Sequence, residues 1–101
     1  MIDYTITSVE AYAENGVNGI AFRVVVKPDS SDEELRQVVQ SIQKLFCEKN
    51  KKITVWFWDR LADILIKVRD SKIVNAIRPY TLAMIEWDVG KDMVIMRRKR
   101  R

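Results

Sequence analysis

The alternation of apolar and polar residues in the first third of the chain predicts a β-hairpin. Residues 4–12 and 20–27 follow the period of two that is typical of strands, with Ile6 on one face of the first strand and Val9 on the other. Two Asn-Gly pairs lie between the strands. Because this dipeptide readily adopts the positive φ angles of tight hairpin turns, we expect the chain to reverse there.

A change of spacing after Pro28 predicts an amphipathic helix. Ser30 and Ser31 are both suitable N-cap residues, and each is followed three residues later by a glutamate, so the start of the helix is open by one residue. Apolar residues then recur at the i, i+3, i+4 spacing of one helical face. They are Leu35, Val38, Val39, Ile42, Leu45 and Phe46. Asn50 can end the helix in a left-handed conformation.

The next strand, residues 53–58, is apolar on both of its faces. One face carries Ile53, Val55 and Phe57, and the opposite face carries two tryptophans. Such a strand belongs in the middle of a sheet, or at a surface that a partner covers.

The second half of the chain contains one ambiguous segment and two further strands. Residues 61–69 fit either a helix or a strand, and we favour the helix because Asp59 can serve as its N-cap. Residues 80–88 and 93–97 alternate as strands around a turn at Gly90. The order β-β-α-β-α-β-β predicts an α+β fold, a two-layer sandwich in which a mixed, mostly antiparallel sheet carries both helices on one face.

Positive charge is concentrated at the end of the sequence. Five of the 18 Lys and Arg residues form the run 97–101, and without it 13 basic and 14 acidic residues remain. We therefore predict a single α+β domain at 1–96 and a basic tail at 97–101. The cations available for nucleic acid are Arg97, Arg98, Lys99, Arg100 and Arg101 of the tail, with Lys49, Lys51 and Lys52 near the helix end.

The residue types of most catalytic and metal-binding motifs are missing. The sequence has no His, no Gly-rich phosphate loop and no Cys-x-x-Cys pair, so we predict a non-catalytic chain without metal or cofactor. Two weaker alternatives stay open. Cys47 has a lysine about one turn away on each side and could be a reactive thiol, although an incidental cysteine is favoured. Asp59 and Asp63 could form a carboxylate pair, although a helix cap is favoured.

The same sequence predicts a cytoplasmic location. No apolar run approaches the roughly 20 residues that span a bilayer, and the first ten residues lack the basic and apolar regions of a signal peptide. The single cysteine excludes an internal disulfide and fits a reducing compartment.

The tryptophans give the leading functional hypothesis. Trp56, Trp58 and Trp87 are candidates for an apolar sheet surface that a protein partner covers, most simply a second copy in a homodimer. We therefore expect a small non-catalytic interaction domain. The alternative is a nucleic-acid-associated protein that uses the basic tail, and a less favoured third possibility is an enzyme built on the carboxylate pair.

Overall fold

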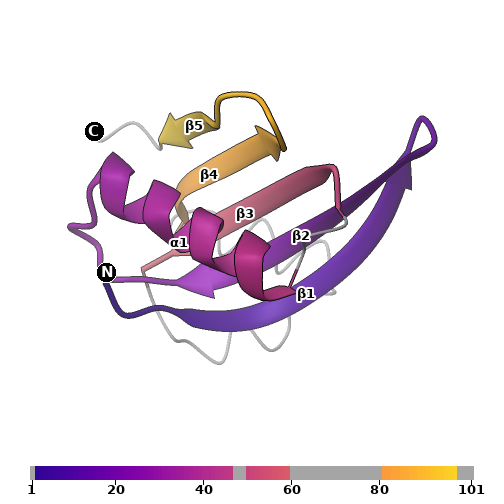
Figure 1. The fold of residues 1–101 in the computed structure, drawn as a ribbon. Coiled ribbons are helices and arrows are strands. Elements are labelled where there is room, and N and C mark those ends of the chain that lie inside the picture. The colour runs from indigo at the N-terminus through magenta and orange to yellow at the C-terminus, as the bar shows by residue number, and fades with distance from the viewer. Residues whose placement is uncertain (1, 47–49, 60–80, 98–101) are drawn as a thin grey trace.

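The structure is a computed structural model that describes residues 2–46, 50–59 and 81–97. Within these ranges, five strands form one sheet and a helix crosses one of its faces (Figure 1). The elements in chain order are β1 (Thr5–Glu14), β2 (Val17–Val25), α1 (Asp32–Phe46), β3 (Lys52–Trp58), β4 (Thr81–Asp88) and β5 (Val94–Arg97). The predicted α+β class is confirmed with one helix. The second predicted helix, at 61–69, lies outside the described residues.

The strands are arranged in the order β1-β2-β3-β4-β5, which places β3 in the middle of the sheet as predicted. β2 and β3 are parallel, and the other neighbouring pairs are antiparallel. α1 connects the two parallel strands, since parallel neighbours cannot be joined by a tight turn. The sheet is therefore mixed and mostly antiparallel, as the sequence predicts.

The β1–β2 hairpin reverses at Asn15 and Gly16. Their φ angles are 51° and 76°, and a type I′ turn requires positive φ at both of these positions. Glu14 pairs directly with Val17, so the two strands continue up to the turn. The second Asn-Gly pair lies within β2. The predicted hairpin is thus confirmed, with strands that extend further toward the turn than expected.

A bulge in β1 changes which of its residues face the helix. The pairing with β2 shifts between Ile6 and Ser8, so the alternation of the strand restarts one residue later. Val9 pairs with the core residue Phe22, and Ile6 pairs with the core residue Val24. The prediction that Ile6 and Val9 occupy opposite faces was wrong, because an inserted residue leaves no mark in a period-two pattern.

Ser31 is the N-cap of α1. Its hydroxyl accepts a hydrogen bond from the backbone N–H of Glu34 at 3.1 Å, and its own N–H donates to the Glu34 carboxylate at 2.9 Å. This reciprocal pair is a capping box, and it decides between the two candidate serines. Ser30 is buried instead, and its hydroxyl donates to the Lys27 carbonyl at 2.7 Å.

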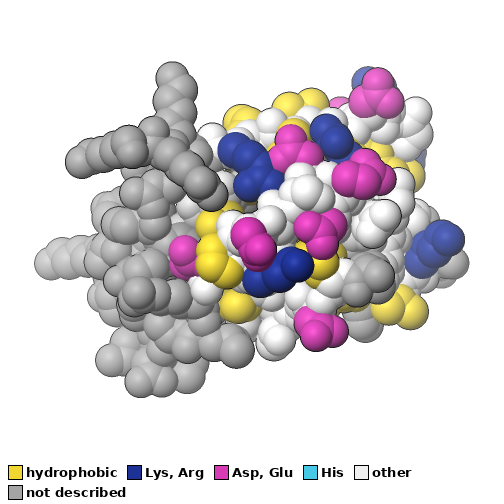
Figure 2. Space-filling view, turned by 90° about the vertical axis from the view of Figure 1, so that its left-hand side faces the viewer, with side chains coloured by type: hydrophobic (Ala, Val, Ile, Leu, Met, Phe, Trp, Pro, Cys, Tyr) yellow, Lys and Arg dark blue, Asp and Glu magenta, His cyan; other side chains and the backbone are white. Residues whose placement is uncertain are grey.

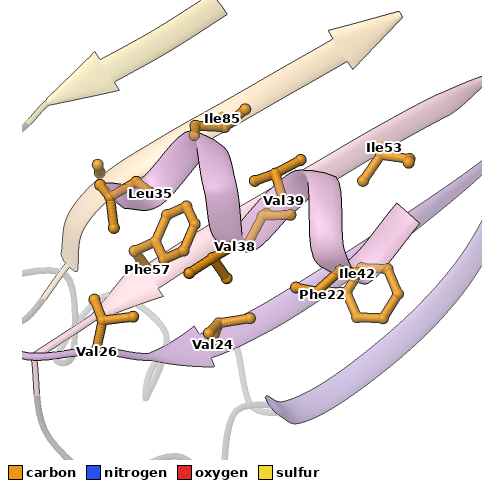
Figure 3. Close-up of a cluster of buried hydrophobic side chains, with 12 residues drawn as sticks. Phe22, Val24, Val26, Leu35, Val38, Val39, Ile42, Ile53, Phe57 and Ile85 are labelled. Atoms are coloured by element: carbon orange, nitrogen blue, oxygen red, sulfur yellow. The ribbon is translucent and has the colours of Figure 1, made fainter. Parts of the chain in front are cut away.

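The hydrophobic core lies between α1 and the sheet face that α1 crosses (Figure 3). The helix contributes four fully buried residues of the predicted stripe: Leu35, Val38, Val39 and Ile42. The sheet contributes Phe22, Val24, Ile53, Val55, Phe57, Ala83 and Ile85. The core therefore lies mostly between α1 and strands β2, β3 and β4. The opposite face of β3 points away from the helix.

Leu45 departs from the predicted stripe, because its side chain is 66% exposed. At 100° per residue it lies about 70° from the centre of the four buried helix residues, at the margin of the apolar face.

α1 has 15 residues and an acidic first turn. In the described part of the chain, no helix has the length and apolarity to cross a membrane.

Candidate functional site

The strand register aligns one row of side chains across the sheet face opposite α1. Arg23 of β2 pairs with Trp56 of β3, Trp56 pairs with Met84 of β4, and Met84 pairs with Met96 of β5. Paired residues project to the same side of a sheet, and the neighbours of Trp56 in its own strand are core residues on the other side. Trp56 and both methionines therefore form an apolar row that ends at the β5 edge.

This row contains much of the exposed apolar surface among the described residues. Trp56 is 37% exposed, Met96 is 44% exposed, and Val94, on the same face of β5, is 56% exposed. We define the far-face patch as Trp56, Met84, Val94 and Met96. Single exposed apolar side chains are common on proteins, whereas large contiguous groups of them are typical of interaction surfaces.

The three tryptophans predicted as interface residues do not share one surface. Trp56 and Trp58 lie on the face opposite α1, and Trp58 is only 4% exposed. The indole N–H of Trp58 has no hydrogen-bond partner among the described residues. Trp87 is on the helix side, where it packs against the core, and its indole N–H donates to the Lys91 carbonyl at 2.8 Å. The structure thus leaves Trp56 as the exposed tryptophan of the far face.

Near β1, the sheet face opposite α1 carries polar side chains that contact one another. The Tyr12 ring lies against Gly19 of β2, and its hydroxyl is 3.3 Å from the Thr54 hydroxyl of β3. The Arg23 guanidinium donates to the Ser8 hydroxyl at 2.9 Å. The face opposite α1 is therefore polar over β1 and β2, whereas over β4 and β5 it carries Met84, Val94 and Met96 beside the exposed carboxylate of Glu86.

Arg97, predicted as the first residue of the basic tail, is the last residue of β5. Its guanidinium donates to the Ser30 carbonyl at 2.6 Å and forms an ion pair with Asp32. Both partners lie at the start of α1, so Arg97 fastens the edge strand to the helix. β5 therefore includes the first residue of the predicted tail.

At the end of the molecule where α1 begins, cationic and acidic side chains are interspersed (Figure 2). Ion pairs join Lys27 to Glu34, Arg36 to Glu33 and Arg97 to Asp32. Of the other predicted nucleic-acid contacts, Lys51 is exposed and Lys52 is half-buried at the start of β3. Lys49 and residues 98–101 lie outside the described residues, as does Cys47. At the end of the molecule where α1 begins, the cations Lys27, Arg36 and Arg97 are thus each paired with a carboxylate.

A third candidate site is an open cavity of about 790 Å³ at the carboxyl ends of the parallel strands β2 and β3. Its described lining includes the carboxylates Asp3, Glu34 and Asp59 and the cation Lys27. One carboxylate oxygen of Asp59 is buried without a hydrogen-bond partner in the described part of the chain. Asp63, its predicted companion, lies outside the described residues. Within the described ranges, no group of three His, Cys, Asp or Glu side chains could hold a metal ion.

The residues of the far-face patch that the sequence prediction did not include are Met84, Val94 and Met96. The alternation of the last two predicted strands already separates Val94 and Met96 from Ile95, and Met84 from Ile85. The missing information was the register, which places these residues beside Trp56.

In comparisons with family models, curated proteins and solved structures, no match to this chain was found.

Proposed function

We propose that this chain is a small non-catalytic interaction domain that associates with a second copy of itself through the far-face patch. The observation that supports the proposal is the continuous row of Trp56, Met84 and Met96, which leads from an exposed tryptophan to an open sheet edge. A two-fold arrangement uses the same patch on both copies, and an apolar patch is complementary to itself.

The size of the patch indicates a weak association. The exposed fractions of Trp56, Val94 and Met96 correspond to roughly 250 Å² of apolar surface in each copy, taking fully exposed areas of about 150–250 Å². Covering this surface in both copies would contribute on the order of 10 kcal/mol. Association costs about 4–15 kcal/mol in lost rigid-body freedom, so the patch alone gives an interaction near balance. We therefore expect a dimer in exchange with monomer.

The test is sedimentation equilibrium across a range of protein concentrations, at low and at high salt. We expect self-association that persists at high salt, because burial of apolar surface is not screened. Met96→Lys should abolish it, since a cation would then lie inside the patch. Leu45→Lys is the matched control: Leu45 is 66% exposed on the helix and outside the patch, so this variant should associate like the wild type. A wild-type chain that stays monomeric at every concentration would refute the proposal.

The same experiment, repeated with a mixed-sequence oligonucleotide, tests the alternative function. A nucleic-acid-associated protein would bind at low salt, release at high salt, and lose binding when residues 98–101 are replaced by serine. That result would move the function from the sheet face to the basic tail. An activity lost in Asp59→Asn without loss of folding would instead support the carboxylate enzyme.

We also propose that residues 61–69 form a second helix and that the chain works in the cytoplasm. Asp59 as an N-cap supports the helix, and the single cysteine supports a reducing compartment. Backbone chemical shifts measured by NMR would test the helix. Extended shifts over these residues would favour the strand interpretation.

A further inference from the structure

The two edges of the described sheet differ in how they resist the addition of another strand. β1 carries a bulge between Ile6 and Ser8 and an exposed carboxylate at Glu10, and both features discourage pairing with a further strand. β5 has neither feature before its last residue: Val94, Ile95 and Met96 follow one another without charge or proline. The β5 edge is therefore the one open to a partner strand.

The hydrogen-bond alternation of the sheet identifies which groups of β5 point outward. The Val89 N–H donates to the Lys51 carbonyl at 2.9 Å, so every second residue of β4, counted back from Val89, bonds to β3. The residues in between, Met84 and Glu86, bond to β5 instead. Their partners on β5 are Met96 and Val94.

The outward N–H and C=O groups of β5 therefore belong to the alternate residues, Ile95 and Arg97. In an antiparallel pair of strands, two residues that exchange both hydrogen bonds stand directly opposite each other. Ile95 of one copy can thus pair with Ile95 of a second copy around a two-fold axis.

We infer that a second copy of this chain pairs with β5 antiparallel, with Ile95 opposite Ile95, so that the two sheets join into one. This inference rests on the proposed function and specifies its geometry. In this register, Val94 of each copy lies directly opposite Met96 of the other in a non-hydrogen-bonded pair, where side chains approach most closely. The two far-face patches then adjoin across the joined edge, where Val94 and Met96 of the two copies meet.

Charge favours the antiparallel direction over the parallel one. Residues 88–92, from the last residue of β4 into the turn, carry Asp88, Lys91 and Asp92, a net charge of −1, and β5 ends at Arg97, whose charge Asp32 already partly neutralises. An antiparallel arrangement places the acidic end of each strand beside the basic end of the other, whereas a parallel arrangement places like charges together. The Arg97 side chain does not obstruct the edge, because it is held at the start of α1.

The contact between two short edge strands is small. A strand pair of this length buries far less than the roughly 1,200 Å² typical of stable complexes, so the dissociation constant is expected to be micromolar or weaker. In this geometry Val94 and Met96 supply the apolar part of the contact, and backbone pairing supplies its direction and register. Trp56 stays exposed, so the association is weaker than one that covers the whole far-face patch.

Disulfide trapping in a Cys47→Ser background tests the register. Val94→Cys protein mixed with Met96→Cys protein should form mixed dimers at least tenfold faster than either protein forms dimers with itself. Paired non-hydrogen-bonded positions have Cα atoms about 4.5 Å apart, within disulfide range. Val94 and Val94 of the second copy would be two residues out of step, about 8 Å apart, which is too far.

Two further variants separate this geometry from a face-to-face dimer. Ile95→Pro removes an outward N–H, which proline allows in an edge strand, and should abolish dimers. Trp56→Ser should retain them, because Trp56 lies two strands from the joined edge. If Ile95→Pro does not fold, Val94→Lys replaces it, with Val9→Lys as the matched control, since both valines are 56% exposed on opposite edge strands.

The outcomes are distinct. Preferential mixed cross-linking that Ile95→Pro or Val94→Lys suppresses supports the inference. Dimers that are lost in Trp56→Ser but persist in Ile95→Pro, or equal cross-linking in all mixtures, overturn the edge geometry and leave the proposed function standing. A wild-type monomer at every concentration overturns both.

Discussion

Replacing Gly19 by alanine tests the way in which Tyr12 crosses the sheet. A Cβ atom at position 19 would lie 2.2–2.6 Å from the end of the Tyr12 side chain, well inside van der Waals contact. The backbone of Gly19 does not have the positive φ angle that favours glycine, so alanine is acceptable to the strand itself. The Tyr12 ring must therefore move away, and its hydroxyl then leaves Thr54.

The expected net effect is a loss of stability. Re-exposing roughly 50 Å² of apolar surface costs about 1.2 kcal/mol. Losing the hydrogen bond between the Tyr12 and Thr54 hydroxyls costs about 0.5–1.5 kcal/mol. Replacing glycine by alanine at a compatible backbone position returns about 0.4–1 kcal/mol through the unfolded state. Gly19→Ala should therefore lower the free energy of unfolding by about 1–2 kcal/mol.

In a Tyr12→Ala background the sign should reverse. No ring then meets the new Cβ, and Gly19→Ala should stabilise the chain by a few tenths to about 1 kcal/mol. Urea denaturation followed by tryptophan fluorescence on the four proteins of this double-mutant cycle gives the coupling energy, expected near 2 kcal/mol. Tyr12→Phe isolates the hydrogen bond. If Gly19→Ala were equally destabilising in both backgrounds, the ring would not lie over Gly19, and the reasoning would be refuted.

Four further changes test the helix and its attachment to the sheet. Leu35→Ala should cost about 2–5 kcal/mol because Leu35 is fully buried, whereas Leu45→Ala at the 66% exposed site should change stability by under about 0.5 kcal/mol, as measured by urea denaturation. Ser31→Ala should cost about 1 kcal/mol by removing the N-cap hydroxyl, a loss that equal unfolding midpoints would contradict. The Ser31 backbone N–H lowers the pKa of Glu34 from its ordinary value of 4.5, so this carboxylate stabilises the fold above pH 4.5 and ceases to do so as the pH falls through the lowered folded pKa. Glu34→Gln should accordingly flatten the acid side of a plot of stability against pH. Arg97→Ala should cost about 1 kcal/mol or less, because its ion pair is partly exposed, and the cost should shrink in high salt; an undiminished cost would mean that packing, and not charge, fastens β5.

Local patterns were sufficient to predict the hairpin, the start of the helix to within one residue, and the central strand. Each depends on residues close together in sequence: the Asn-Gly turn at Asn15, the capping box at Ser31, and the apolar run of β3. The core face of α1 was also predictable up to Ile42, because the 3.6-residue period determines which side chains share a face.

Long-range geometry could not be read in the same way. The bulge after Ile6 reverses the faces of β1, and nothing in an alternating pattern marks an inserted residue. The different exposures of Trp56 and Trp58, at 37% and 4%, arise although both side chains belong to the same face of one strand. Arg97 belongs by composition to a basic run, and only the position of β5 beside the start of α1 gives it two partners.

The distribution of charge and exposed apolar surface decides which proposal should be tested first. At the start of α1, the guanidinium of Arg97 and the ammonium of Lys27 already have carboxylate neighbours, so a phosphate approaching that surface would have to compete with Asp32 and Glu34. The four residues of the far-face patch are apolar and have no ion pair to break. Such side chains are best covered by another apolar surface. A second copy presents that surface at the same concentration as the chain itself. Self-association is therefore the interaction to measure before any other ligand is sought.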